Sequence, residues 1–332
     1  MTGAPLLEAR KLSVDFATRE GMVRAVSEVD LDLAPGETLA IVGESGSGKS
    51  QMLMSMLGLV ARNARVSGSA KFKGEELLTA SEQRLNEIRG SAISLVFQDP
   101  MTSLNPYLSI GLQLTEPLLV HKGVDRAAAA AQAVAMLKSV HITEPERRME
   151  QYPHQLSGGM RQRVAIAMAL ICEPEILIAD EPTTALDVTV QAQVLSLLRE
   201  IREEFHTAII LVTHDLGVIA ELGDRVNVMY AGKIVERGSV DDIFYHCRHP
   251  YTEALERSIP QFTKIRPARL KAISGNPPNP LHLPAGCAFH PRCPYRLDEC
   301  DKRVPLLETV GPDHAKACFY EGPLGMAEEL SA

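Results

Sequence analysis

The stretch GESGSGKS, residues 43–50, holds the residues with the clearest chemical meaning in this chain of 332 residues. It follows the apolar run 38–42, where we expect a buried strand, and precedes the run 51–57, where we expect a helix. Glycines let such a loop curl so that its N–H groups and the helix N-terminus point at phosphate oxygens, while a lysine neutralises the β- and γ-phosphates and a serine hydroxyl binds Mg²⁺. The pattern therefore predicts a Walker A loop with nucleotide contacts from Gly43, Glu44, Ser45, Gly46, Ser47, Gly48, Lys49, Ser50 and Gln51, and with Ser50 on Mg²⁺.

Two carboxylates close a second apolar run, residues 175–180, which is also expected to be a buried strand. Neighbouring side chains on a strand point to opposite faces, so Asp180 and Glu181 are expected to do different work. Asp180 suits the binding of Mg²⁺, and Glu181, just past the strand end, suits a general base for an attacking water.

Further elements are needed to position these groups. Ser157-Gly158-Gly159 precedes an expected helix over residues 161–172, and the apolar run 208–213 predicts a strand that ends just before His214. A neutral imidazole in that place can reach a γ-phosphate. Strand-like runs near residues 12–16, 26–33 and 71–72 indicate an additional antiparallel β portion. The stretch of about 99–160 is predicted to be helical and includes an alanine-rich helix over 126–140.

These motifs, taken in order over roughly residues 10–245, resemble the nucleotide-binding subunits of ABC transporters. The resemblance rests on GESGSGKS, VFQDP, LSGGM, the 175–181 strand, Ala-Leu-Asp at 185–187 and LVTHD. It implies an α/β fold, the P-loop NTPase cassette, with a mainly parallel sheet core, an antiparallel β subdomain and a helical subdomain.

The same resemblance implies roles for further residues in ATP and Mg²⁺ binding. Gln98 is expected to contact Mg²⁺ and to act with Glu181 and His214 in catalysis, and Phe16 is expected to stack on adenine. The resemblance also places Ser157, Gly158, Gly159 and Asp187 at the nucleotide site. It implies that the first three bind the γ-phosphate of an ATP held by the opposite subunit. Met160 stands where the family usually has Gln, and little loss of activity is expected.

From Pro250 onward the composition becomes rich in proline, which predicts an irregular appendage over residues 251–332 after a cassette over 1–250. This segment, with FQDPMTSLNP and YPHQLSGGMRQR, resembles the oligopeptide and dipeptide importer subfamily, closest to the D-type subunits of oligopeptide permeases. The resemblance implies ATP-driven peptide import with a second homologous ATPase in a heterodimer, two membrane permeases and an extracytoplasmic peptide-binding protein. Nickel, glutathione or antimicrobial-peptide import with the same machinery stays open, as does a soluble ATPase acting on nucleic acid. A regulatory subunit without hydrolysis is disfavoured because Glu181 and His214 are both present.

The charge balance disfavours nucleic acid as a partner. The chain has 34 Lys and Arg against 42 Asp and Glu, a net charge of −8, which gives no general attraction to polyanions. The N-terminus has no basic segment followed by an apolar one, and charges interrupt every apolar run. We therefore expect a soluble chain held peripherally, through the permeases, at the cytoplasmic face of the inner membrane.

Four of the six cysteines gather near the end of the chain, at Cys287, Cys293, Cys300 and Cys318. Thiols stay reduced in the cytoplasm, so a metal site is favoured over disulfides. The spacing lacks the paired C-x₂-C of zinc ribbons, and soft thiolates in a proline-rich loop suit an iron–sulfur cluster. A [4Fe–4S] cluster is also what the subfamily resemblance implies, while Zn²⁺ or free thiols remain alternatives. Because the groups needed for hydrolysis lie between Lys49 and His214, apart from this segment, a structural or sensory role is predicted for the cluster.

Overall fold

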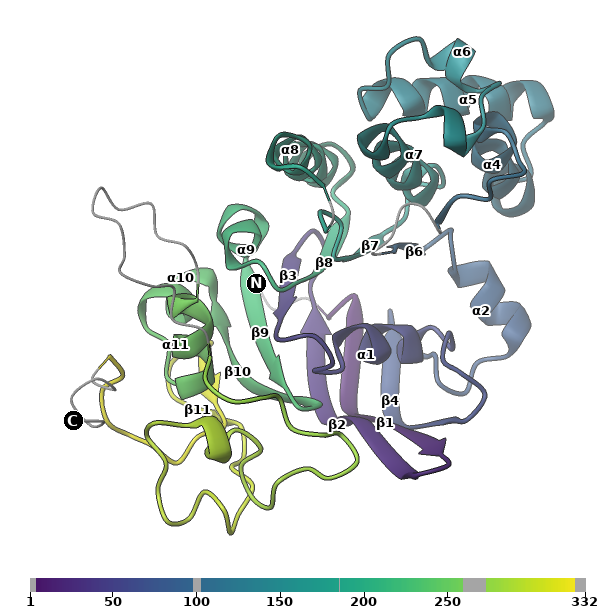
Figure 1. The fold of residues 1–332 in the computed structure, drawn as a ribbon. Helices are drawn as coiled ribbons and strands as arrows, with labels where there is room; N and C mark the ends of the chain where they lie inside the picture. The colour runs from purple at the N-terminus through teal and green to yellow at the C-terminus, as the bar shows by residue number, and fades with distance from the viewer. Residues whose placement is uncertain (1–3, 98–102, 185, 259–272, 326–332) are drawn as a thin grey trace, which may run out of the picture. The chain divides into compact units, whose positions relative to one another are not determined.

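The computed structural model describes residues 4–97, 103–184, 186–258 and 273–325, which form two compact units (Figure 1). The first unit consists mainly of residues 33–38 and 79–212. The second contains 5–32, 39–78 and the chain from 213 onward. The phosphate-loop sequence and the cysteine segment therefore belong to the same unit, although more than 200 residues separate them.

The second unit holds an antiparallel sheet and a mixed group of strands. The strand order β2-β1-β4-β5 forms one sheet, in which β1 pairs antiparallel with β4 and β4 with β5. The order β11-β12-β10-β9-β3 forms the mixed group, in which only β3 and β9 are parallel. The strands are β1 (Leu7–Thr18), β2 (Gly21–Leu33), β3 (Thr38–Val42), β4 (Ala64–Phe72), β5 (Glu75–Glu76), β9 (Arg225–Tyr230), β10 (Lys233–Ser239), β11 (Glu308–Thr309) and β12 (Ala315–Lys316). The predicted antiparallel portion is confirmed.

One apolar core joins the strands of this unit to its helices and to the C-terminal segment. All five residues of β3 are buried, as a strand covered on both faces requires. Tyr251 and Phe289 are among the largest fully buried side chains and pack in one cluster with Tyr230. The helices are α1 (Lys49–Met56), α9 (Leu216–Leu222), α10 (Val240–Tyr245), α11 (Pro250–Arg257) and the 3₁₀ turn η3 (His290–Arg292).

The first unit combines three parallel strands with a group of helices. The strand order is β8-β7-β6, and every residue of β7 and β8 is buried. Its elements are α2 (Glu82–Ile88), β6 (Ile93–Val96), α4 (Ile110–Pro117), the π-type turn η1 (Leu118–Lys122), α5 (Arg126–Ser139), α6 (Pro145–Arg148), the 3₁₀ turn η2 (Pro153–Gln155), α7 (Gly158–Leu170), β7 (Ile176–Asp180), α8 (Val188–Phe205) and β8 (Ala208–Thr213). The regular elements described between β6 and β7 are all helices or helical turns, joined by short irregular stretches.

The C-terminal segment differs from the expectation at its beginning. Residues 250–257 form helix α11, with Tyr251 completely buried, where the proline-rich composition indicated irregular structure. Pro250 is compatible with a helix because it occupies the first turn, where its missing N–H costs nothing. Residues 273–325 contain only η3 and two strands of two residues each, so the irregular reading holds there (Figure 1).

Among the residues that the structure describes, no helix is both long and apolar enough to cross a membrane.

Candidate functional site

The phosphate-loop residues 43–50 form a tight backbone curve between β3 and α1. Gly48 takes a left-handed conformation with φ of 102°, and a Cβ added there would lie 2.3 Å from the carbonyl oxygen of Ala25. A Cβ on Gly43 would lie 2.1 Å from the carbonyl oxygen of Met229. Because backbone atoms stand in both places, only glycine fits, which is the reason for the glycines that the sequence motif contains.

Three polar features of this loop bear on ligand binding. Lys49 Nζ donates to the carbonyl oxygens of Gly43 at 2.7 Å and of Glu44 at 3.0 Å. Ser47 Oγ is buried without a hydrogen-bond partner in the described structure, and no side-chain hydrogen bond caps the N-terminus of α1. A lysine ammonium, an unpartnered buried hydroxyl and an uncapped helix N-terminus in one loop fit a nucleotide phosphate with Mg²⁺.

The carboxylates of the second motif lie where they were expected in the first unit. Asp180 is the last residue of β7 and is buried, while Glu181 follows the strand and is half-buried. Glu181 has a φ of 48°, a conformation that residues with a side chain rarely adopt. Its N–H donates to Val212 O at 2.8 Å, and its carboxylate accepts from Thr184 Oγ1 at 2.8 Å. The unusual backbone conformation and the two hydrogen bonds of Glu181 fix the orientation of its carboxylate, as a general base requires.

Sequence reasoning missed two side chains that hold this carboxylate and the backbone of the residue that follows it. Thr184 is one of them, and Gln162 on α7 is the other. Gln162 is fully buried and donates from Nε2 to Pro182 O at 2.7 Å. Gln162 stands between Arg161 and Arg163 in a polar stretch of α7, so the sequence holds no signal that singles it out.

The glycines of the signature motif have two different environments. Ser157 caps α7 by accepting from Met160 N–H at 3.3 Å. A Cβ on Gly158 would meet nothing within 4 Å, whereas a Cβ on Gly159 would lie 2.9 Å from Val190 Cγ1 on α8. Gly159 therefore allows α7 and α8 to pack closely, and Gly158 leaves bare backbone open to an incoming ligand.

The remaining predicted residues are placed individually. His214 directly follows β8 and is exposed, and Phe16 is half-buried on β1. Asp187 caps α8 by accepting from Val190 N–H at 3.0 Å. Gln98 and Ala185 lie outside the described residues. The roles given to all these residues, and to those of the phosphate loop, stay predictions.

The four C-terminal cysteines come together although the sequence separates them by up to 31 residues. All four thiols line one small cavity in the second unit, together with His249 and Phe289. Cys287 N–H donates to Cys300 O at 2.7 Å, so the two ends of the first loop are joined through the backbone. Burial raises the pKa of Cys293 to about 12 and that of Cys318 to about 11. Such thiols need a strong cation to ionise.

The cysteine arrangement does not match a single-ion site. Among the described residues, no three or more His, Cys, Asp or Glu side chains stand close enough to hold one metal ion. The described cysteines are all free thiols. The iron–sulfur cluster and its zinc alternative therefore stay predictions. Cys172 and Cys247 do not line this cavity, as expected of ordinary thiols.

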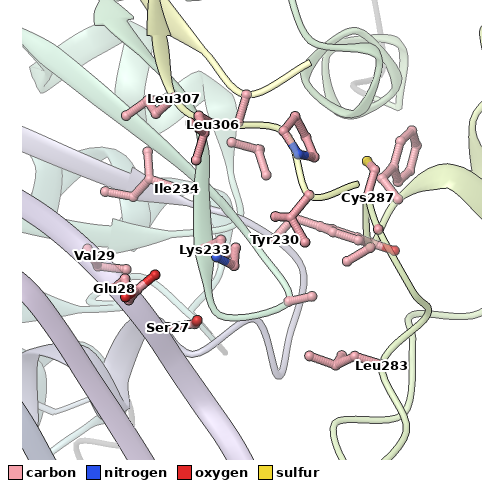
Figure 2. A pocket seen from close by; sticks show the side chains of 18 of the residues that line it. Ser27, Glu28, Val29, Tyr230, Lys233, Ile234, Leu283, Cys287, Leu306 and Leu307 are labelled. Atoms are coloured by element: carbon pink, nitrogen blue, oxygen red, sulfur yellow. The ribbon is translucent and has the colours of Figure 1, made fainter. Parts of the chain in front are cut away.

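A larger cavity of about 810 Å³ in the second unit borders the cysteine cavity and shares Cys287, Phe289 and Pro305 with it (Figure 2). Its walls come from β2, the β9–β10 hairpin and the C-terminal segment, and include Glu28, Lys233, Leu283 and Leu306. None of the residues 43–50 lines it. This cavity is therefore separate from the predicted nucleotide residues.

Comparison with known proteins assigns the chain to a family. The family model described as "ABC transporter" matches residues 26–184, and the model "Oligopeptide/dipeptide transporter, C-terminal region" matches residues 235–300. Among solved structures, a dimeric post-hydrolysis state of the ATP-binding cassette MJ0796 bound to ADP and Pi matches at a TM-score of 0.64 and 30% identity. That match covers 70% of this chain and 98% of the cassette.

Two curated relatives match almost from end to end. The dipeptide transport ATP-binding protein DppD of Bacillus subtilis is 50% identical over 318 residues, 95% of each chain. The oligopeptide transport ATP-binding protein OppD of Salmonella typhimurium is 53% identical over 314 residues, 95% of this chain and 93% of that protein. With the cassette elements and the glycine-dependent loop in place, this similarity shows that the chain belongs to the ABC transporter family, among the ATP-binding proteins of oligopeptide and dipeptide transporters.

Proposed function

We propose that this chain hydrolyses ATP at the phosphate loop and powers the import of peptides. As a member of its family the chain is an ABC ATPase that binds ATP with Mg²⁺. The observation that carries the assignment to this loop is its interior, where Lys49 Nζ and the unpartnered Ser47 Oγ lie beside an uncapped helix N-terminus. Phosphate oxygens would satisfy all three.

The reaction needs residues that hold the nucleotide and residues that prepare water. Lys49 balances the β- and γ-phosphate charge, and Ser50 with Asp180 and Gln98 would hold Mg²⁺, which neutralises charge that develops during phosphoryl transfer. Glu181 accepts the proton of the attacking water, and His214 holds that water and the γ-phosphate in line. Phe16 stacks on the adenine ring. The hydrogen bond from Thr184 to Glu181 keeps the carboxylate oriented.

Hydrolysis further requires a second ATPase subunit. Ser157, Gly158 and Gly159 present a helix N-terminus, and Gly158 is open to an incoming ligand, as a contact with ATP on an opposite subunit requires. We propose a heterodimer with a related ATPase, with Asp187 near the shared nucleotides, and closure of this dimer as the step that drives transport.

The transporter around the dimer would contain two permeases and an extracytoplasmic peptide-binding protein. The chain would sit peripherally at the cytoplasmic face of the inner membrane. Peptide import is favoured over nickel, glutathione or antimicrobial-peptide import because both curated relatives described above are named for peptides. Co-purification with permeases instead of nucleic acid would exclude a nucleic-acid ATPase.

Glu181→Gln tests the hydrolytic role. The change should lower kcat by about 10² to 10⁴ because the water loses its base, while ATP binding is retained because the phosphate loop is unchanged. The assay is phosphate release by the assembled transporter, with the equivalent glutamate of the partner ATPase also changed. Glu204→Gln, at an exposed position on α8, is the matched control and should keep full turnover. Normal hydrolysis by the Glu181→Gln transporter would refute the assignment.

We further propose that Cys287, Cys293, Cys300 and Cys318 bind a [4Fe–4S] cluster. Four thiols around one cavity supply the ligand set that such a cluster takes. In a four-iron cluster each thiolate binds a different iron, so the sulfurs stand farther apart than around one zinc ion. Because a metal must displace the proton of each buried thiol, the raised pKa values of Cys293 and Cys318 predict that metal binding strengthens as the pH rises.

Anaerobic purification tests the cluster. The protein should contain about four irons per chain and absorb broadly in the visible range. Changing any one of the four cysteines to serine should remove the iron, whereas Cys247→Ser, a half-buried thiol outside the cavity, should keep it. Finding one zinc per chain would refute the cluster and support the zinc alternative. Finding no metal would mean that the four cysteines are ordinary thiols.

A further inference from the structure

The C-terminal segment reaches directly into the phosphate loop through Arg292. Its guanidinium donates from Nη1 to Glu44 Oε2 at 2.6 Å and from Nη2 to Glu44 Oε1 at 2.9 Å, a bidentate ion pair across 248 positions of sequence. The Arg292 side chain is 4% exposed and that of Glu44 is 24% exposed. Paired donors of this kind constrain the direction of a carboxylate as well as its charge.

Glu44 is held by its backbone as well as by its carboxylate. Its N–H donates to the hydroxyl of the buried Tyr251 at 2.8 Å, and its carbonyl accepts from Lys49 Nζ at 3.0 Å. All three polar groups of Glu44 are therefore bonded, one to the C-terminal segment, one to α11 and one to the lysine proposed to bind phosphate. A shift of Glu44 would be passed to Lys49.

Aromatic packing supports the same connection. Arg292 Nη1 also donates to Tyr230 Oη at 3.3 Å, and the guanidinium lies 5.9 Å from the ring centroids of both Tyr230 and Phe289. Phe289 packs against Tyr230 and Tyr251 at centroid distances of 5.3 and 5.4 Å. The stretch 287–293 thus contributes both an ion pair and a buried ring to the neighbourhood of the loop.

We infer that Arg292 is a positioning residue of the nucleotide site, which couples the order of the cysteine segment to ATP affinity through Glu44. The inference rests on the proposed function, because it requires the loop to bind ATP. Arg292 directly precedes Cys293, and Cys287 is bonded through its backbone to Cys300. Whatever orders these cysteines therefore holds Arg292 in place. By reciprocity, ATP binding stabilises the cysteine segment to the same degree.

The test is ATP affinity in the intact chain carrying Arg292→Gln. We expect about 10-fold weaker ATP binding, which corresponds to about 1.4 kcal/mol. Arg296→Gln is the matched control, because Arg296 lies in the same segment and pairs with Asp301 at 2.9 Å but does not touch the loop. It should leave the ATP Kd unchanged. Arg292→Lys keeps the charge but loses the paired geometry, so it should recover only part of the affinity.

A double-mutant cycle separates positioning from a general loss of stability. If Arg292 acts through Glu44, then Arg292→Gln in a Glu44→Gln background should weaken ATP binding much less than it does alone. A merely structural role would lower Tm and leave the ATP Kd unaltered well below the unfolding temperature. Additive effects of the two changes on the Kd would overturn the coupling through Glu44.

Lys49→Ala distinguishes failure of the inference from failure of the proposed function. If Lys49→Ala abolishes ATP binding while Arg292→Gln leaves it intact, the inference is wrong and the nucleotide site stands. If Lys49→Ala also leaves ATP binding intact, the proposed site itself is wrong. Should Arg292→Gln not fold, the Arg292→Lys and Glu44→Gln variants carry the same comparison, and an unchanged Kd in both overturns the inference.

Discussion

The phosphate loop and the cysteine segment, two parts of one compact unit, are held in opposite ways. Residues 43–50 keep their shape mainly through backbone geometry, with Gly43 and Gly48 close to backbone carbonyl oxygens and Gly232 N–H donating to Ser47 O at 2.9 Å, while the side chains of Arg292 and Tyr251 act on Glu44 alone. Residues 287–300 form almost no regular structure and are held by side chains, chiefly Arg292 and Phe289. We therefore expect most substitutions of the loop glycines to destabilise the protein. In the cysteine segment, only substitutions of the few buried side chains should do so.

The same contrast extends to buried polar groups of the C-terminal region. His314 Nε2 lies 2.8 Å from Glu236 Oε1, with both side chains buried, and Glu236 also accepts from His249 N–H at 3.1 Å. The first contact joins the residue that precedes β12 to β10, and the second joins the N-cap residue of α11 to β10. Replacing a single buried side chain of this region should therefore lower the free energy of unfolding.

The largest effect should come from Gly48→Ala, which tests the backbone half of the comparison. A methyl group would meet Ala25 O at 2.3 Å on a backbone with φ of 102°, so we expect a loss of roughly 3 to 5 kcal/mol in the free energy of unfolding. Urea denaturation measures it. Gly46→Ala is the control within the same loop, because its φ is 80° but nothing lies within 4 Å, and it should cost about 1 kcal/mol. Equal losses in the two variants would contradict the backbone argument.

A second effect, of intermediate size, concerns pH and the buried His249. Burial lowers the pKa of His249 to about 4 from an ordinary 6.5. The unfolded chain therefore binds the proton more readily, and stability falls as pH drops below 6.5 and stops falling below about 4. Between pH 7 and pH 5 this group should cost about 2 kcal/mol of unfolding free energy.

The variant that isolates this contribution is His249→Asn. Asparagine does not titrate and keeps an acceptor for the first turn of α11, where His249 Nδ1 now accepts from Tyr251 N–H at 3.0 Å. The pH 5 loss should shrink by about 2 kcal/mol in this variant. His154→Gln, at an exposed position, should leave the pH dependence of unfolding as it is. A pH profile unchanged by His249→Asn would show that other groups cause the acid sensitivity.

The smallest effect should come from Arg296→Gln, which tests whether exposed side chains matter in the C-terminal segment. Its pair with Asp301 is 2.9 Å long, but the side chains are 48% and 39% exposed, so we expect less than about 0.5 kcal/mol by urea unfolding. A loss above about 1 kcal/mol would mean that surface pairs, and not only buried contacts, hold this segment.

Much of the cassette was predictable from local patterns. The apolar runs 38–42 and 208–213 match β3 and β8 residue for residue, and the strand that ends at Asp180 also lies where it was expected. Continuous apolar runs of five or six residues are recognisable because a strand covered on both faces cannot hide polar side chains. Helix α11 was missed because proline was read as a breaker, although at the first turn of a helix it is accepted. The expectation for Gln98 lies outside the described residues.

The sequence by itself determined the chemistry: the glycines, the lysine and the carboxylates can be recognised because each motif is local and its spacing follows from one loop or one strand. The four cysteines were likewise visible as a group in the sequence, and all four line one cavity, while their role as metal ligands stays a prediction. Only the tertiary structure decided that Arg292 binds Glu44, because 248 positions separate them and no local periodicity relates an irregular segment to a distant loop. Arg292 is buried because the core places Phe289 and Tyr251 beside it. This placement results from the packing of the whole unit, so it cannot be inferred from any single stretch of sequence.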